Sequence, residues 1–129
     1  MSETLTTKEL SNAALAYYGD SVLELLVRER LVRGGLSTAA HLNAAARDYV
    51  TAPKQACAME RLMPHLTEEE AAIYRRGRNN IHANVPKRAT VGEYRAATGM
   101  ECLFAALDLT GREERARELF ELAYPTEYL

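Results

Sequence analysis

The sequence has few of the features that mark special classes of protein. It contains no tryptophan and only two cysteines among 129 residues, and no apolar run approaches the roughly 20 residues that cross a membrane. Cys57 and Cys102 stand in apolar helical contexts without CxxC spacing, which argues against a structural zinc site and predicts two buried thiols. The first residues do not resemble a secretory signal. We therefore expect one domain over residues 1–129, located in the cytoplasm.

The net charge is −2, so the chain as a whole lacks the positive charge of a typical nucleic-acid-binding protein. Its basic residues are nevertheless concentrated, because six of them accompany a single acidic residue, Glu93, between residues 75 and 95. Such a segment on an otherwise acidic protein is suited to binding a phosphate backbone. Alternatively, the arginines at 75–78 only offset the dipole at the end of a helix. The six basic residues are Arg75, Arg76, Arg78, Lys87, Arg88 and Arg95.

Signals for the starts and ends of helices predict an all-α protein of about six to seven helices, with no convincing strand. Ser11 is expected to cap a long first helix that ends before glycines 34 and 35, and Ser37 to cap a second that reaches about Tyr49. Thr67 and Thr90 each precede a glutamate by three residues, which is the pattern of a capping box. The other helices are expected over about residues 51–63, 67–78, 90–110 and 112–124, with a short turn at 6–9 and a loop at 81–89.

Two of the expected helices each carry one carboxylate in an apolar stretch. Asp20 lies in the first, within residues 15–23, and Glu101 is the only charged residue between Arg95 and Asp108. A helix that is apolar on nearly all sides belongs in the middle of a bundle, where a carboxylate needs a cation or a set of donors. Two carboxylates that meet inside a bundle share a proton or hold a cation. Oxygen-only ligation favours magnesium or manganese over zinc.

Each carboxylate has a glycine close by in the sequence. Gly19 stands one residue before Asp20, and Gly99 stands two residues before Glu101. A glycine inside a helix costs about 1 kcal/mol relative to alanine, so its presence calls for a compensating reason. We therefore expect another backbone or a ligand to approach closely at both positions.

Taken together, these residues resemble the catalytic domain of ribonuclease III. The resemblance is greatest to Mini-ribonuclease III, the short branch of that family that has no double-stranded-RNA-binding domain. It rests on three segments in the expected order and spacing, namely residues 14–20 (ALAYYGD), 76–79 (RGRN) and 94–101 (YRAATGME). The implied fold is a compact helical bundle of the ribonuclease III catalytic-domain type.

The resemblance implies that Asp20 and Glu101 are the catalytic residues and that they bind Mg²⁺, for which Mn²⁺ can substitute. Full-length ribonuclease III carries further acidic residues where this chain has Ala13, Ala16 and Thr98. The Mini-ribonuclease III branch shares this loss, which leaves the number of bound metal ions open.

Two further residues lie about one helical turn from the carboxylates. Glu24, four residues after Asp20, either holds a metal-bound water or is an ordinary ion-pair partner. Thr98, three residues before Glu101, is expected to position a water or a neighbouring helix.

The resemblance implies a magnesium-dependent endoribonuclease that cleaves double-stranded RNA and leaves 5′-phosphate and 3′-hydroxyl ends. Its expected substrate is ribosomal RNA precursor (23S rRNA), which the six basic residues would bind. A homodimer is expected, because cutting both strands needs two carboxylate pairs. Two other functions stay open at this point. The chain could be a noncatalytic helical RNA-binding or ribosome-associated protein, or an all-α metal-dependent nucleotide hydrolase.

Overall fold

The computed structural model describes residues 6–80 and 89–126. These ranges contain six α-helices, two short 3₁₀ helices and no strand, which confirms the predicted all-α fold. None of the helices in them is both long and apolar enough to cross a membrane. The α-helices are α1 (Asn12–Arg33), α2 (Ala39–Val50), α3 (Ala52–Leu62), α4 (Glu68–Arg78), α5 (Val91–Leu109) and α6 (Glu113–Ala123), and the 3₁₀ helices are η1 (Thr6–Glu9) and η2 (Met63–His65).

Most helix starts follow the local signals in the sequence. The Ser11 side chain accepts a hydrogen bond from the backbone N–H three residues on and so caps α1. Complete capping boxes begin α4 at Thr67 and α5 at Thr90. The predicted cap of α2 at Ser37 is wrong. The backbone stays extended for one residue more, and the Thr38 side chain accepts the capping hydrogen bond instead.

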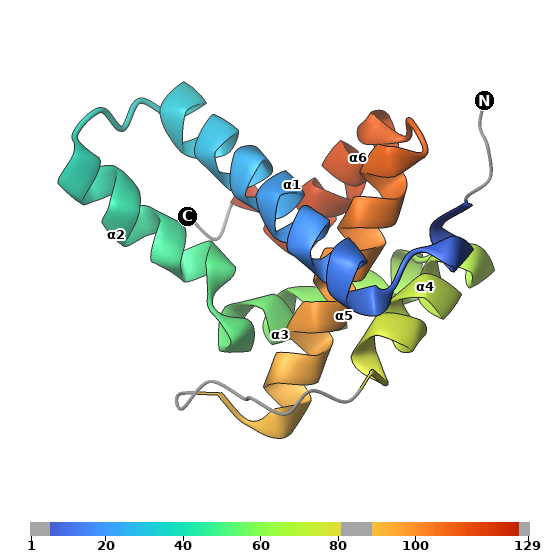
Figure 1. The fold of residues 1–129 in the computed structure, drawn as a ribbon. Coiled ribbons are helices and arrows are strands. Elements are labelled where there is room, and N and C mark those ends of the chain that lie inside the picture. The colour runs from blue at the N-terminus through green and yellow to red at the C-terminus, as the bar shows by residue number, and fades with distance from the viewer. Residues whose placement is uncertain (1–5, 81–88, 127–129) are drawn as a thin grey trace.

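Helix α5 is the centre of the fold, and α1, α3, α4 and α6 all pack against it (Figure 1). Every residue from 97 to 107 is buried except Glu101, which is half-buried. A helix surrounded on all sides by other helices has no need of a polar face, which explains why this stretch is almost entirely apolar. Glu101 therefore interrupts the most buried element of the protein.

Helix α1 lies across α5 with one side exposed, so the prediction that its apolar stretch occupies the middle of the bundle is wrong. On the exposed side, Tyr17 and Leu25 are 84% and 68% accessible to solvent, and Asp20 is also exposed. The composition of the stretch suggested burial on all sides, but only one row of residues, spaced by four positions, is fully buried. That row consists of Leu15, Gly19, Leu23, Val27 and Leu31.

Helix α3 contacts the core through one face, which contains Ala58, Met59 and Leu62. Cys57 is on another face and is exposed, whereas Cys102 in α5 is buried. The prediction of two buried thiols is therefore confirmed for Cys102 and wrong for Cys57. A cysteine in an amphipathic helix takes the environment of the face on which it falls.

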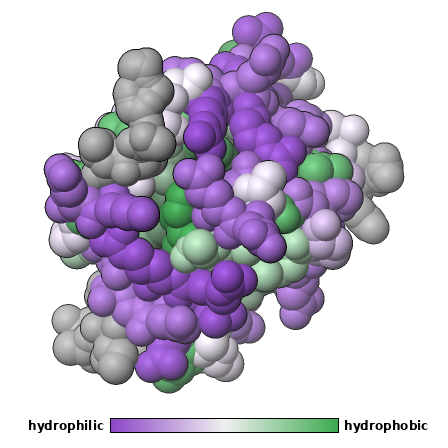
Figure 2. All heavy atoms as spheres, turned by 90° about the vertical axis from the view of Figure 1, so that its right-hand side faces the viewer, coloured by the Kyte–Doolittle hydropathy of each residue, from purple (hydrophilic) through white to green (hydrophobic). Residues whose placement is uncertain are grey.

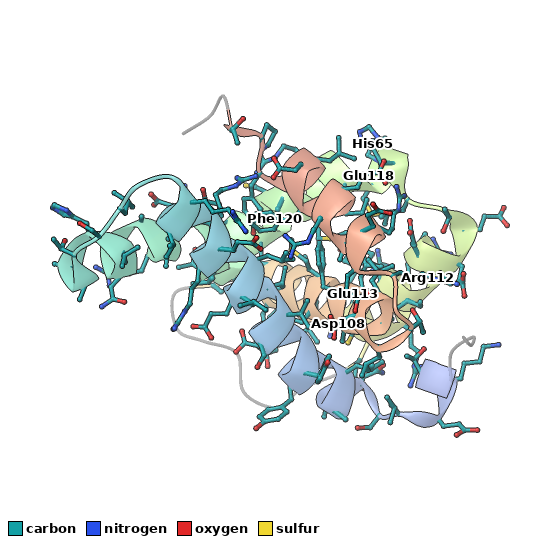
Figure 3. The ribbon with its side chains drawn as sticks, turned by 90° about the horizontal axis from the view of Figure 1, so that it is seen from above. His65, Asp108, Arg112, Glu113, Glu118 and Phe120 are labelled. Atoms are coloured by element: carbon teal, nitrogen blue, oxygen red, sulfur yellow. The ribbon has the colours of Figure 1, made fainter. Side chains whose placement is uncertain are left out.

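A buried ion pair joins α6 to the start of α4. Arg115 donates from Nε to Glu70 Oε2 (2.8 Å) and from Nη2 to Glu70 Oε1 (2.9 Å). The same guanidinium also bonds the His65 carbonyl and the Glu118 carboxylate, which lie side by side at this end of the molecule (Figure 3). Glu70 is only 3% exposed and also accepts the backbone N–H of Thr67. This network fixes the position of α4 relative to α6.

Glycines allow α5 to make close backbone contacts on two sides. A Cβ atom on Gly19 of α1 would lie 1.8 Å from the backbone oxygen of Glu101. A Cβ atom on Gly99 would lie 2.6 Å from the Tyr74 ring of α4, and one on Gly77 would lie 3.1 Å from the Gly99 Cα atom. Close approach of another helix, rather than a ligand, therefore accounts for both glycines noted in the sequence.

Candidate active site

A cavity of about 460 Å³ opens between α1, α3 and α5. Asp20 lines it from α1, Thr98 and Glu101 line it from α5, and Gln55 lines it from α3. The rest of its wall is mostly small or aromatic, with alanines from all three helices. The structure thus brings the two predicted carboxylates together, although they are 81 positions apart in the sequence.

The contact between Gly19 and the Glu101 backbone determines how the two carboxylates meet. Because no side chain separates the helices there, Asp20, the next residue of α1, is placed beside the Glu101 side chain. Burial, the negative charge of Asp20 and a hydrogen bond between the two carboxyl groups together raise the pKa of Glu101 to about 8. At neutral pH and without a cation, the pair therefore shares one proton.

The donor set fits a hard divalent cation. Asp20 and Glu101 offer carboxylate oxygens, and nowhere in residues 6–80 and 89–126 do three or more His, Cys, Asp or Glu side chains form a metal-binding group. Magnesium is commonly held by one or two carboxylates, and water and substrate phosphate supply the remaining ligands. Structural zinc needs four protein ligands, usually cysteine and histidine, which this cavity does not provide. The two carboxylates are therefore enough to hold magnesium, but they are too few for a structural zinc site.

Thr98 is buried in the wall of the cavity. Its hydroxyl donates a hydrogen bond to the Tyr94 carbonyl one turn earlier (3.0 Å). Since the hydroxyl proton is used in this bond, only the lone pairs of the oxygen remain to accept a hydrogen bond from a water in the cavity. The expected role of Thr98 in placing a water stays a prediction, and its place in the cavity wall allows it.

Glu24 lies outside the cavity. It forms an ion pair with Arg28 (2.9 Å), the residue four positions on in α1, and both side chains are at least half exposed. Of the two roles that the sequence left open for Glu24, the structure shows the ion pair. Such exposed pairs contribute little to stability.

Gln55 is a cavity residue that the sequence analysis did not single out. It is 4% exposed and stands on the buried face of α3, in the same row as Ala58, Met59 and Leu62. A polar residue in an otherwise apolar row of an amphipathic helix is the signal that could have identified it. The signal is weak because it becomes informative only when the buried face of the helix is known.

Among the six basic residues, Arg76 has a clear structural task. Its guanidinium donates hydrogen bonds to the carbonyls of Thr7 (3.3 Å) and Leu10 (2.6 Å), and its own carbonyl accepts one from Asn12 (3.5 Å). These bonds hold the segment before α1 against the end of α4, where Figure 1 shows the two side by side. Contact with RNA at Arg76 would have to involve the part of its guanidinium that these bonds leave exposed.

The other arginines differ in exposure. Arg75 is exposed, while Arg78 lies over the Tyr74 ring (5.7 Å) and Arg95 is half-buried in α5. None of the four described arginines lines the cavity. Seen from the side of α4, the surface is mostly hydrophilic (Figure 2). The remaining two predicted RNA-binding residues, Lys87 and Arg88, lie outside the described residues.

The sequence also matches a known protein family and several of its members. The sequence profile of the Ribonuclease III domain matches residues 13–112, a range that includes both carboxylates. The chain is 44% identical over 109 residues to a Mini-ribonuclease 3 from Symbiobacterium thermophilum, covering 84% of each chain. It is 42% identical over 114 residues to a Mini-ribonuclease 3 from Enterococcus faecalis, covering 87% of this chain and 86% of that one.

A solved structure shows a similar fold. The crystal structure of a Fusobacterium nucleatum protein superposes with a TM-score of 0.84 at 28% sequence identity. The match covers 93% of this chain and 96% of the other. The arrangement of helices around α5 is therefore shared over nearly the whole length of both proteins.

Proposed function

The chain belongs to the ribonuclease III domain family, in its Mini-ribonuclease 3 branch, and is an endoribonuclease; from this premise we propose that it cuts double-stranded RNA at the cavity shared by Asp20 and Glu101. The observation that carries the proposal is the pairing of these two carboxylates. They are placed by a glycine contact between α1 and α5, and they line one cavity, at which Asp20 is exposed to solvent.

Asp20 and Glu101 are the proposed ligands of Mg²⁺, with Mn²⁺ as a substitute. When bound, such a cation neutralises charge on a phosphodiester and lowers the pKa of the attacking water. The two side chains line the same cavity from different helices, and Thr98, which also lines it, can accept a hydrogen bond from water there. Attack of water on phosphorus with cleavage of the bond to O3′ leaves 5′-phosphate and 3′-hydroxyl ends, and no protein nucleophile is needed.

The proposed contacts to RNA involve the arginines near the end of α4 and Arg95 of α5. Duplex RNA is recognised mostly by its shape and its phosphates, for which guanidinium groups are well suited. Arg75 and Arg78 are the clearest candidates, because Arg76 already holds the segment before α1. Lys87 and Arg88 remain candidates on sequence grounds alone.

The proposed active form is a homodimer. Each chain supplies one carboxylate pair, whereas cutting both strands of a duplex requires two. The exposed side of α1 carries large apolar side chains along the length of the helix, with Tyr17, Leu25 and Val32 between 61% and 84% exposed. Apolar surface of this kind along one helix is suited to a contact with a second copy.

The proposed natural substrate is ribosomal RNA precursor, in maturation of 23S rRNA in the cytoplasm. This part of the proposal rests on membership of the Mini-ribonuclease 3 branch and not on any residue of the cavity. Accumulation of unprocessed 23S precursor in cells that lack the protein would support it. Normal processing in such cells would contradict it.

One assay separates the proposed function from its alternatives. The purified protein is expected to cut a labelled RNA duplex when Mg²⁺ is added and to stop when the cation is chelated. A noncatalytic RNA-binding protein would retain the duplex uncut. A nucleotide hydrolase would release phosphate from small nucleotides and leave the duplex intact.

A further inference from the structure

We propose that Gln55 and the first turn of α3 form a phosphate-binding subsite that holds one phosphodiester of the RNA against the carboxylate pair. The inference rests on the proposed function, since it assigns a role within the same cavity. Its ligand is an RNA phosphodiester, and its chemistry is hydrogen bonding from N–H donors to phosphate oxygens.

The first observation is the environment of Gln55. The residue is only 4% exposed and lines the cavity, yet its carboxamide makes no hydrogen bond with any other residue in the ranges 6–80 and 89–126. The amide atoms are not among the polar atoms that are fully cut off from solvent, so they reach the space of the cavity. The face of α3 that carries Gln55 is otherwise apolar, so Leu or Met would suit packing better. A ligand in the cavity would supply the missing partner.

The second observation is the shortage of other donors in the cavity wall. Asp20 and Glu101 accept hydrogen bonds when they are ionised, and the Thr98 hydroxyl proton is bonded to a carbonyl. Tyr17 is 84% exposed, so its side chain projects mostly into solvent and not into the cavity wall. A phosphodiester accepts hydrogen bonds and is repelled by carboxylates. Apart from the hydroxyl of the half-buried Tyr94, which also lines the cavity, the two N–H groups of the Gln55 amide are therefore the side-chain donors that the inner wall offers to it.

The third observation is the start of α3, which reaches the same cavity through Ala52 and Gln55. Thr51 precedes the helix, but its side chain makes no capping hydrogen bond, unlike the caps of α1, α4 and α5. The N–H groups of a helix start carry partial positive charge and favour anions. Pro53 has no N–H, and the backbone N–H of Gln55 is bonded to the Thr51 carbonyl, so Ala52 supplies the backbone N–H of this turn at the cavity wall, beside the Gln55 amide.

The two sides of the cavity then have complementary roles. On one side, Asp20 and Glu101 bind the cation. On the other side, the N–H groups of α3 donate hydrogen bonds to the phosphate. A phosphodiester between them is held in one orientation for attack by water, and correct orientation contributes strongly to rate. Gln55 touches the substrate in this arrangement and is distinct from the cation ligands.

The test is single-turnover cleavage of a labelled RNA duplex with enzyme in excess and Mg²⁺ present. Gln55→Met keeps the approximate volume and removes both hydrogen-bonding groups. Gln55→Glu keeps acceptor oxygens but replaces the N–H donors by negative charge. The control, Glu60→Met, introduces the same side chain at an exposed position of α3.

Gln55→Met is expected to lower the cleavage rate at subsaturating enzyme by about 10- to 100-fold, the usual effect of losing a hydrogen bond to a charged group. The concentration of Mg²⁺ that gives half the maximal rate should not change. Gln55→Glu should lose more activity than Gln55→Met, because it repels phosphate. Glu60→Met should cleave like the unaltered protein.

Three results would overturn the inference. Gln55→Met could cleave at the unaltered rate, Gln55→Glu could cleave faster than Gln55→Met, or Gln55→Met could need more Mg²⁺. The last two would mark the Gln55 oxygen as a cation ligand. If Gln55→Glu does not fold, the Mg²⁺ titration of Gln55→Met decides alone. Failure of the unaltered protein to cut the duplex would instead refute the proposed function.

Discussion

Gly19→Ala tests whether the contact between α1 and α5 builds the active site. The added Cβ atom would lie 1.8 Å from the Glu101 backbone oxygen, whereas ordinary van der Waals contact begins at 3.4 Å. The helices must therefore separate by about 1.6 Å along this line, which is the difference between these two distances. No rotamer change can relieve the clash, because both partners belong to helix backbones.

The expected cost follows from this geometry. Overpacking a core usually lowers the free energy of unfolding by about 1–3 kcal/mol. Because this clash is between two helix backbones, we expect a loss at or above the top of that range. Alanine recovers about 0.5–1 kcal/mol through its better helix propensity. We therefore expect Gly19→Ala to lower the free energy of unfolding by about 2–3 kcal/mol or more. A displacement of this size should also lower the cleavage rate by about 100-fold, since Asp20 moves with the helix.

Gly92→Ala is the matched control for this substitution. Gly92 also lies in a helix, but the nearest atom to an added Cβ is 4.0 Å away, so alanine fits without a clash. This variant should be as stable as the unaltered protein or slightly more stable, with full activity. Urea unfolding and duplex cleavage well below the melting temperature measure both effects. Unchanged stability and unchanged cleavage in Gly19→Ala would refute the assigned role of the helix contact.

Three further predictions concern the ion pair, the RNA contacts and the assembly. Arg115→Ala should destabilise the protein by about 3 kcal/mol in urea unfolding at pH 7, because it leaves the buried Glu70 carboxylate without its partner. Burial raises the pKa of Glu70, but the hydrogen bonds from Arg115 and Thr67 and the charge of Arg115 together outweigh it and hold the pKa below its ordinary 4.5. The stabilisation is therefore complete above that pH and is lost as the pH falls further. Equal acid sensitivity of the variant and the unaltered protein would contradict this. Replacing Arg75 and Arg78 together by alanine should weaken duplex binding for all sequences and reduce the dependence of binding on salt concentration. If filter binding shows an unchanged salt dependence, the two arginines only offset the dipole at the end of α4. Sedimentation should give twice the 14.4 kDa chain mass, and Leu25→Lys should shift it toward a single chain; a monomer that cuts both strands would contradict the dimer.

Features that depend on a few neighbouring residues could be predicted from the sequence. The caps at Ser11, Thr67 and Thr90 involve groups three residues apart, so the sequence contains both partners of each hydrogen bond. The same holds for the end of α1, where Gly35 adopts a φ of 100°. The misplacement of the α2 cap from Thr38 to Ser37 shows the limit, since both side chains can accept the bond.

Features that depend on which face of a helix meets which neighbour could not be predicted in the same way. The exposure of Asp20 and Cys57 follows from the rotation of α1 and α3 against α5, which local spacing does not reveal. Gln55 was overlooked for the same reason, because its burial becomes unusual only once α3 is docked. The pairing of Asp20 with Glu101 was expected because both interrupt apolar stretches, and the resemblance to a family supported it.

The most direct test of the account is cleavage of an RNA duplex by Asp20→Asn and Glu101→Gln. Each substitution replaces one carboxyl group by an amide of similar volume and removes the repulsion between the two carboxyl groups, so both variants should be at least as stable to unfolding as the unaltered protein. The account predicts that both lose cleavage while the unaltered protein cuts the duplex in Mg²⁺. Cleavage by both variants at rates near that of the unaltered protein would show that the Asp20 and Glu101 pair is not the active site.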